Sequence, residues 1–231
     1  MNIQEAKEKL KKDGCTFFNL KGFDEEFYDF LLRLKCNEET NLKSKMNHLR
    51  LDIEGGITNI PSKKVQIQHK FDSFEEANNA AELAIKDCYE TNKSVTFMQY
   101  WYYNDLRPLL GDTGINTYNN GIFNIVNYLY DINVSKLSTH SSQLTYYKKD
   151  CFLMRHSDGY GTGRICALLI YLNESYNEED GGILILNNNQ KIVPTFGTVA
   201  IIDLQSFDIP HEVTKVLDGI GRYACISFVK N

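Results

Sequence analysis

Residues 151–186 read CFLMRHSDGYGTGRICALLIYLNESYNEEDGGILIL, and this stretch decides the fold. Strand-forming runs (CFLMRH, RICALLIYL, GILIL) alternate in it with turn-forming segments (DGYGTG, NEEDGG). The alternation continues on both sides, from QLTYY to TVAIID, HEVTKV and RYACISFV. Many short strands with regular turns are typical of a sandwich or barrel and not of a doubly wound parallel sheet. We therefore predict a mainly β fold, with a jelly roll over residues 140–231.

The chain before residue 140 has a more helical pattern. Ile3 and Leu10 share a helical spacing that Gly14 can end, Asp24 can cap a second helix, and Ser73 heads an S-x-x-E capping box. We expect the second and third helices to cover the outside of one sheet, because each has one apolar face. The predicted elements are helices at 1–14, 24–35, 73–90 and 121–133, strands at 15–20 and 95–103, and a loop over 37–64.

Composition narrows the class of protein. The 231 residues are 42% hydrophobic and 24% charged, which is ordinary for a globular protein. A formal net charge of −5 argues against a nucleic-acid-binding protein, which needs clustered Lys and Arg. No apolar run approaches the roughly 20 residues of a membrane span, and the N-terminus lacks the apolar core of a signal peptide. We therefore expect a cytoplasmic protein without nucleic-acid or membrane partners.

The cysteine pattern agrees with a reducing compartment. None of the six cysteines forms a C-x-x-C pair. Cys151, Cys166 and Cys225 lie inside apolar runs, where a thiol behaves as a small hydrophobic group. We therefore predict reduced thiols and not a disulfide framework.

Three side chains can form a metal site. His156 and Asp158 are two residues apart at the end of a predicted strand, so they can project from the same face. A third ligand should come from another strand, and His211, after Pro210, is the best candidate. Two histidines and one carboxylate make the facial triad of non-haem Fe(II) oxygenases, which leaves positions open for a co-substrate and O₂.

A lone arginine adds to this pattern. Arg222 shares its predicted strand face with Ala224, Ile226 and Phe228, and a buried guanidinium needs an anionic partner. A small dicarboxylic acid that chelates iron at one end could offer its far carboxylate to Arg222. Each residue has an ordinary interpretation as a surface turn, a packed histidine or a solvated arginine. The joint order of H-x-D, strands, P-H and a terminal G-R-Y favours the site.

These motifs carry a family resemblance. HSDGYGTGRICALLIYLNESYNEEDGGILIL, followed by IPHEV and GRYACISFV, resembles the 2-oxoglutarate- and Fe(II)-dependent oxygenases of the prolyl 4-hydroxylase superfamily. The resemblance covers about residues 140–231 and is strongest for the group with arginine in the last strand, which includes the oxygen-sensing prolyl hydroxylases. It implies a double-stranded β-helix with supporting helices. It also implies a single dioxygenase domain over residues 1–231, in which 1–139 supply support and first strands and 140–231 form the core.

The resemblance also assigns residues and cofactors. It implies that Fe(II), 2-oxoglutarate and O₂ are used, with ascorbate as a further candidate, and that the partner is a protein or peptide substrate. Gly181 and Gly182 are interpreted as a tight backbone position. The implied roles are metal ligands His156, Asp158 and His211; co-substrate contacts Arg222, Tyr171 and Tyr146, with Tyr147 as the alternative to Tyr146; and substrate contacts Arg164 and Phe228.

Two departures bear on the substrate. Tyr176 stands where many relatives have tryptophan, and Arg222 stands where many collagen-type and viral relatives carry lysine. The first hypothesis is a dioxygenase that hydroxylates prolyl residues, an enzyme of the procollagen-proline 4-hydroxylase type, although both departures argue against collagen-like substrates. The alternatives are the same chemistry on a free amino acid, another side chain or a metabolite, and a non-catalytic binding module with the same fold.

Overall fold

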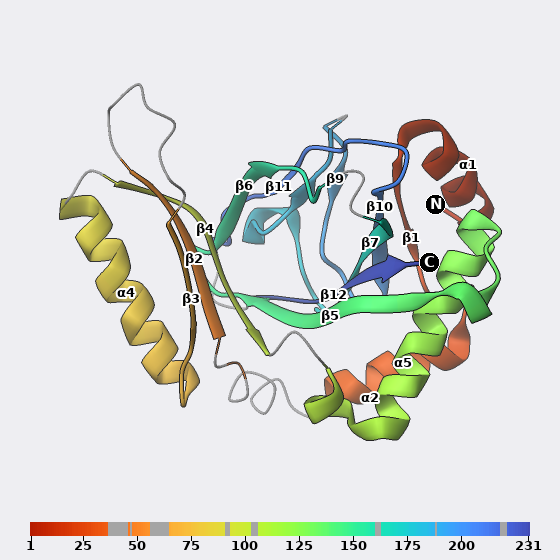
Figure 1. Cartoon of the computed structure of the whole chain (residues 1–231), viewed down its shortest axis with the longest axis horizontal. Coiled ribbons are helices and arrows are strands. Elements are labelled where there is room, and N and C mark those ends of the chain that lie inside the picture. Colours follow the sequence, from red (N-terminus) through yellow and green to blue (C-terminus); the bar gives the residue numbers. More distant parts are fainter. Residues whose placement is uncertain are drawn as a thin grey trace.

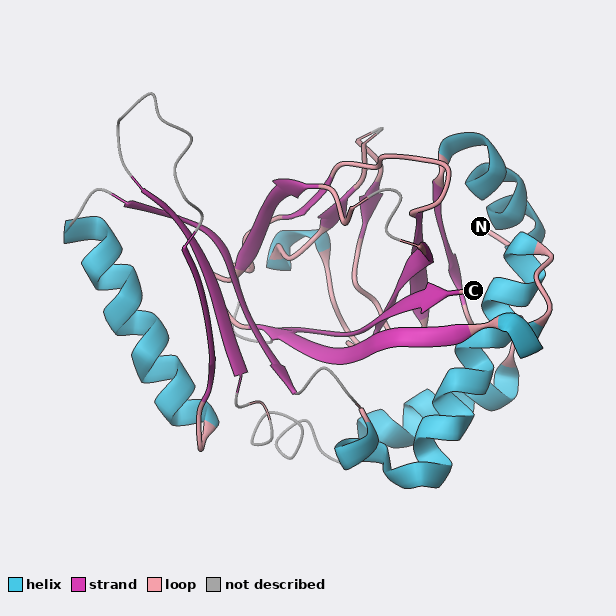
Figure 2. Cartoon of the chain, in the orientation of Figure 1, coloured by secondary structure: helices cyan, strands magenta, loops and turns pink. Residues whose placement is uncertain are grey.

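The computed structural model describes residues 1–36, 46, 48–55, 65–90, 93–102, 106–159, 163–187, 189–217 and 221–231. Strands dominate it, and helices cluster toward the N-terminal half (Figures 1 and 2). The helices are α1 (Ile3–Asp13), α2 (Glu25–Cys36), α4 (Phe74–Glu90) and α5 (Arg107–Tyr130), with 3-10 turns η1 (Val134–Lys136) and η2 (Glu178–Asp180). The strands are β1 (Cys15–Asn19), β2 (His48–Gly55), β3 (Val65–Lys70), β4 (Lys93–Tyr102), β5 (Ser138–Tyr147), β6 (Phe152–His156), β7 (Arg164–Tyr171), β8 (Leu184–Ile185), β9 (Lys191–Ile192), β10 (Thr198–Asp203), β11 (His211–Val213) and β12 (Arg222–Lys230).

The strands pair antiparallel along one hydrogen-bonded path in the order β1-β10-β7-β12-β5-β4-β6-β11-β8-β9. Strand β2 pairs with β4, and β3 pairs with β2, off this path. The path curls so that β6, β11 and β8 face the layer made by β7, β12 and β5 (Figure 1). These two facing antiparallel layers make the double-stranded β-helix, or jelly roll, that the sequence predicts.

Two helices begin with the caps expected from the sequence, and α1 ends at the expected glycine. In α1 the Asn2 side chain accepts a hydrogen bond from the backbone of Glu5, and Gly14 ends the helix with φ +70°. In α2 the carboxylate of Asp24 accepts from the N–H of Phe27 at 2.9 Å. In α4 Ser73 Oγ accepts from the N–H of Glu76 at 3.1 Å, but the Glu76 carboxylate accepts from the N–H of Asp72 and not from that of Ser73.

The helices divide between two surfaces, so the expectation that they cover one sheet is wrong. α4 packs on β2 and β4, whereas α2 packs on α5, and α1 packs on α5 and β1 (Figure 1). The outlying sheet that contains β2 and β4 lies against α4, and the surface covered by α1, α2 and α5 lies at the other end of the molecule (Figure 1).

Three other expectations need correction. The loop predicted over 37–64 is wrong at β2, and the rest of that range, apart from residue 46, lies outside the described residues. The helix predicted from residue 121 begins at Arg107, with one non-helical residue at Gly111. Strands β3 and β9 were not predicted, because Val65–Lys70 is mostly polar and Lys191–Ile192 is only two residues long. No helix in the described ranges combines the length and apolarity needed to cross a bilayer.

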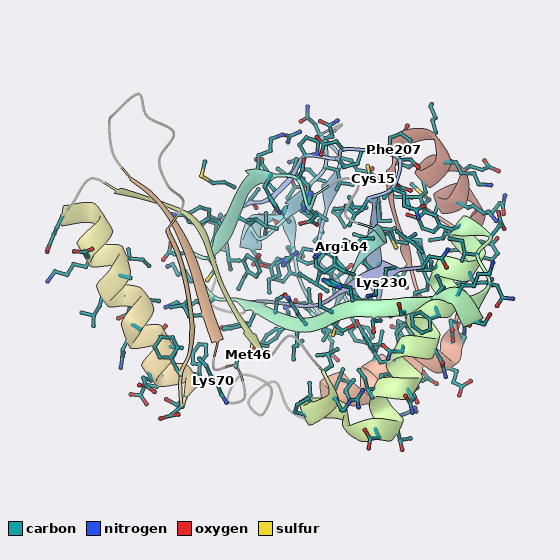
Figure 3. The ribbon with its side chains drawn as sticks, in the orientation of Figure 1. Cys15, Met46, Lys70, Arg164, Phe207 and Lys230 are labelled. Carbon is teal, nitrogen blue, oxygen red and sulfur yellow. The ribbon has the colours of Figure 1, made fainter. Side chains whose placement is uncertain are left out.

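One cluster of buried apolar side chains links these parts among the described residues. It runs from α1 and α2 through α5 to the interior of β7 and β10, whose residues are almost all buried (Figure 3). Tyr118 of α5 joins this cluster and hydrogen-bonds Ser227 of β12 at 2.9 Å. The helices therefore fix the outer side of the strand that carries Arg222.

The buried cysteines should resist alkylation in the native protein. Cys15, Cys151, Cys166 and Cys225 are free and buried, and burial raises the pKa of Cys151 and of Cys225 to about 12. Because the thiolate is the nucleophile, iodoacetamide should leave these four residues unmodified at neutral pH. Peptide mapping after alkylation, with a urea-unfolded control in which all four react, checks this. Rapid native modification of Cys151 or Cys225 would contradict the packing described here.

Candidate metal and co-substrate site

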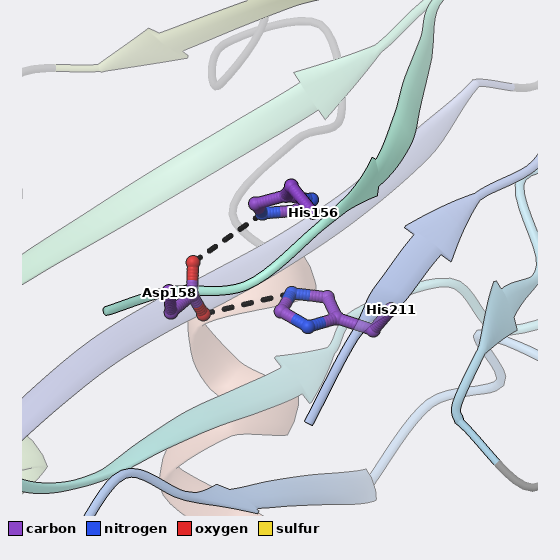
Figure 4. A group of neighbouring side chains, drawn as sticks. All are labelled: His156, Asp158 and His211. Atoms are coloured by element: carbon purple, nitrogen blue, oxygen red, sulfur yellow. Dashed lines mark ion pairs between the residues drawn. The ribbon is translucent and has the colours of Figure 1, made fainter. Parts of the chain in front are cut away.

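The structure brings His156, Asp158 and His211 together (Figure 4). His156 ends β6 and His211 begins β11, and the two are direct partners in the antiparallel pair. One potential ligand atom from each of the three residues lies within 4.8 Å of the others. Asp158 Oδ1 is 3.4 Å from His156 Nε2, and Asp158 Oδ2 is 3.5 Å from His211 Nε2. A metal ion bound by all three would sit between these atoms.

A β-bulge turns His156 toward this site. His211 pairs with His156 and Val213 pairs with Leu153, so β6 has one more residue between the pairs than β11 has. Side chains of a regular strand alternate between its two faces, which would put Leu153 and His156 on opposite faces. The extra residue of the bulge places both on the same face of the sheet as Val213 and His211, with which they pair. The two bulged residues, Met154 and Arg155, are exposed.

The backbone fixes the orientation of both imidazoles. His156 Nδ1 lies 3.1 Å from the carbonyl oxygen of Met154, and His211 Nδ1 lies 3.0 Å from that of Ile209. A carbonyl oxygen only accepts, so each Nδ1 carries the hydrogen and each Nε2 is available to a metal. Such outer hydrogen bonds set the tautomer and ring orientation of metal-binding histidines.

The charges of the site suit a divalent cation. Burial opposes ionisation of Asp158, but the adjoining His156 and the nearby His211 and Arg164 together hold its pKa below the ordinary value. Burial also lowers the pKa of His211, against the opposing effect of Asp158. At neutral pH both shifts favour the deprotonated forms, which are the forms that bind metal.

Arg222 begins β12 and is fully buried without a carboxylate partner among the described residues. Its Nη2 donates to the Tyr171 hydroxyl at 3.3 Å, and the rings of Tyr147 and Tyr171 each lie 4.9 Å from its Cζ. Its Nε and Nη1 have no hydrogen-bond partner in the part of the chain that the structure describes. A buried cation with unsatisfied donors is costly unless an anion binds it. Arg222 therefore has the charge and the free donors to bind the far carboxylate of a dicarboxylic acid.

Tyr147, and not Tyr146, lies beside Arg222. Tyr147 pairs with Arg222 across β5 and β12, whereas Tyr146 pairs with Tyr223. Tyr146 stacks on Tyr223 with ring centroids 4.7 Å apart and also contacts Phe74. Neighbouring residues of a strand face opposite ways, so Tyr146 points away from the guanidinium. The geometry favours Tyr147, the alternative, as the candidate co-substrate contact, and the role itself stays a prediction.

Arg164 and Phe228 also lie together. The guanidinium of Arg164 stacks over the ring of Phe228 at 4.3 Å, and both side chains are half-buried. Arg164 is close enough to the metal ligands for its charge to lower the pKa of Asp158. Their role as substrate contacts stays a prediction.

Gly182 adjoins Arg222 in a way that glycine alone permits. Its φ is +60°, and a Cβ added there would lie 3.1 Å from Arg222 Cδ, 3.0 Å from a methyl carbon of Val216 and 2.7 Å from the Tyr176 hydroxyl. The sequence showed this position as a tight turn, but its contact with Arg222 depends on strands that meet only in the fold.

The Gly182→Ala variant should lose both stability and affinity for a dicarboxylate. Left-handed backbone costs a non-glycine residue about 1–2 kcal/mol, and the new contacts would push against Arg222. Gly22→Ala is the matched control, because Gly22 has φ +87° with nothing within 4 Å of an added Cβ. Urea denaturation and calorimetry of both variants check this. Equal losses of stability, with unchanged ligand binding, would show that the contacts of Gly182 are unimportant.

Comparison with known proteins agrees with this geometry. Residues 142–230, which contain the three candidate ligands and Arg222, match the model of the 2OG-Fe(II) oxygenase superfamily, where 2OG is 2-oxoglutarate. No curated protein sequence matches the chain.

Solved structures share the fold at low sequence identity. A prolyl-4-hydroxylase of Pseudomonas putida matches with a TM-score of 0.56 and 13% identity over 100% of this chain and 99% of its own. A prolyl hydroxylase of Trichoplax adhaerens, in complex with a peptide of hypoxia inducible factor, matches with a TM-score of 0.56 and 16% identity. The match covers 99% of this chain and 88% of that one. A non-heme alpha-ketoglutarate-dependent epimerase of nogalamycin biosynthesis matches with a TM-score of 0.54 and 9% identity. The match covers 99% of this chain and 82% of that one. Residues 142–230 are therefore similar to the 2OG-Fe(II) oxygenase superfamily, and the chain shares its fold with solved prolyl hydroxylases.

Proposed function

We propose that this oxygenase hydroxylates prolyl residues in a protein or peptide and consumes 2-oxoglutarate and O₂ in the reaction. One oxygen atom of O₂ enters the substrate C–H bond as a hydroxyl group, and the other enters succinate as 2-oxoglutarate loses CO₂. The buried Arg222, with two unpartnered nitrogens, carries the co-substrate assignment.

Each side chain has a definite part in this proposal. His156, Asp158 and His211 would hold the metal through two Nε2 atoms and a carboxylate oxygen. Iron bound there would supply the redox chemistry that couples oxidation of 2-oxoglutarate to hydroxylation. Arg222 would bind the far carboxylate through Nε and Nη1, and the Tyr171 hydroxyl, 3.3 Å from Nη2, would hold the guanidinium in place.

The resemblance and the shared fold support a prolyl substrate. The family resemblance is strongest for the arginine-type prolyl hydroxylases. Two solved structures with the same fold are prolyl hydroxylases, and one of them was determined in complex with a peptide of hypoxia inducible factor. The epimerase with the same fold shows that this architecture also serves other reactions.

Mass spectrometry of peptides tests the proposal. A proline-containing peptide library is incubated with the protein, Fe(II) and 2-oxoglutarate, with and without ascorbate, and succinate is measured in parallel. Gain of one oxygen atom on proline is the expected result. Oxygen on another side chain, or succinate formed only with free amino acids or metabolites, would replace prolyl hydroxylation by one of the alternatives. No succinate with any substrate would favour a binding module.

A further inference from the structure

Asn173 holds the backbone on both sides of Arg222. It lies two residues after the end of β7 and is 2% exposed. Its Nδ2 donates to the carbonyl of Gly221 at 2.8 Å, and its Oδ1 accepts from the N–H of Tyr223 at 2.8 Å. The side-chain amide therefore bonds the two residues that flank the arginine.

The amide takes the place of a missing strand. One edge of β12 pairs with β5, where Arg222 faces Tyr147. Along the other edge, pairing with β7 ends where Ala224 faces Tyr171. The N–H of Leu172 still donates to the carbonyl of Tyr223, at 3.1 Å, before the chain turns away.

The alternating direction of the backbone polar groups along β12 explains why the side-chain amide of Asn173 is needed. In an antiparallel ladder the polar backbone groups of successive residues point to opposite edges. The carbonyl of Gly221 and the N–H of Tyr223 therefore point to the β7 side, where the β7 backbone no longer offers partners. Asn173 supplies one donor and one acceptor, which extends the ladder past Arg222.

This bonding bears on the guanidinium because few hydrogen bonds orient it. The Arg222 side chain makes one hydrogen bond, to Tyr171, among the described residues. Gly221, with φ +73°, allows the Tyr146 ring to approach so closely that an added Cβ would lie 2.2 Å from it. Movement of the 221–223 backbone would therefore shift Arg222 directly, and a misplacement of 1 Å can cost about 100-fold in function.

We propose that Asn173 is a positioning residue for 2-oxoglutarate, which acts by fixing the start of β12 so that Arg222 can bind the far carboxylate. This inference rests on the proposed function, since it assumes that Arg222 binds the co-substrate. It assigns Asn173 no contact with the metal or the ligand.

Calorimetry with a double-mutant cycle tests the inference. The titrations add 2-oxoglutarate to the Mn(II)-loaded wild type, Asn173→Ala, Arg222→Ala and the double variant. Asn173→Ala should weaken 2-oxoglutarate binding by about 10- to 100-fold and leave Mn(II) affinity within about twofold. The double variant should bind no more weakly than Arg222→Ala, because both changes remove the same interaction. In turnover assays KM for 2-oxoglutarate should rise while kcat at saturation stays near the wild-type value.

A matched control separates positioning from general stability. Tyr118→Phe removes another buried hydrogen bond to β12, at Ser227, five residues from Arg222. It should lower stability and leave 2-oxoglutarate affinity unchanged. Should Asn173→Ala fail to fold, Asn173→Ser replaces it, and hydrogen exchange of the Tyr223 amide reports whether the backbone bond is lost.

The outcomes are distinct. Two results would overturn the inference and leave the proposed function standing. The first is wild-type affinity for 2-oxoglutarate in a folded Asn173 variant that has lost the Tyr223 bond. The second is additive effects on affinity in the double variant. Absence of 2-oxoglutarate binding to the wild type, or wild-type affinity in Arg222→Ala, would overturn the proposed function itself.

Discussion

The Asp158→Ala variant should lose Fe(II)-dependent succinate production while its fold survives. Asp158 is the only carboxylate in the candidate triad of described residues, and it lies 3.4 and 3.5 Å from the two Nε2 atoms. Loss of a residue that only supports a ligand commonly costs about 10- to 100-fold in metal affinity or activity, so loss of the carboxylate itself should cost at least as much. Circular dichroism and succinate assays at several Fe(II) concentrations measure both effects.

Asp150→Ala provides the matched control. Asp150 lies on the turn before β6, and its carboxylate is exposed and 3.7 Å from Lys215 Nζ. This variant should retain wild-type turnover. If Asp158→Ala also kept wild-type Fe(II)-dependent activity, Asp158 would not be a ligand and the triad would be wrong.

Substitution of Arg222 should separate the two parts of the site. Arg222→Ala should weaken 2-oxoglutarate binding by about 2–5 kcal/mol, which is about 30-fold to several thousand-fold. Metal affinity without 2-oxoglutarate should change little, because Arg222 is not a ligand. Anaerobic calorimetry with both ligands measures the difference, and Arg107→Ala, which removes an exposed guanidinium on α5, is the control.

Arg222→Met gives a further test, because it should raise stability if the arginine serves the ligand and lower stability if the arginine serves the fold. The guanidinium of Arg222 is buried with unpartnered Nε and Nη1, so it burdens the ligand-free fold. Replacement of buried charged groups by apolar side chains of similar size often stabilises a protein by about 1–4 kcal/mol. Arg222→Met should therefore unfold at higher urea concentration than the wild type while it fails to bind 2-oxoglutarate. Lower stability together with retained binding would mean that the arginine serves the fold.

The sequence predicted the jelly roll well because its signals are local. Apolar runs such as RICALLIYL and turns such as NEEDGG mark strands without knowledge of their partners. The helix caps at Asp24 and Ser73 are likewise formed by neighbours within three residues. By contrast, β2 and β3 are mixed in polarity, and the pairing of β2 with β4 depends on residues far along the chain.

The site was predictable in composition but not in detail. His156, Asp158, His211 and Arg222 stood out because their residue types are unusual at those strand positions. The choice between Tyr146 and Tyr147 depends on the β5–β12 register, which the sequence does not contain. The bulge at Met154 and Arg155 and the amide bonds of Asn173 are also products of pairing between distant strands.

A crystal structure of the protein, from crystals grown without oxygen and with Mn(II) and 2-oxoglutarate, tests the central claim most directly. The account predicts a metal ion bound by His156 Nε2, His211 Nε2 and a carboxylate oxygen of Asp158, with 2-oxoglutarate on the metal. It further predicts the far carboxylate of 2-oxoglutarate within hydrogen-bond distance of Arg222 Nε or Nη1. A metal ion bound elsewhere, or a 2-oxoglutarate whose far carboxylate does not reach Arg222, would contradict it.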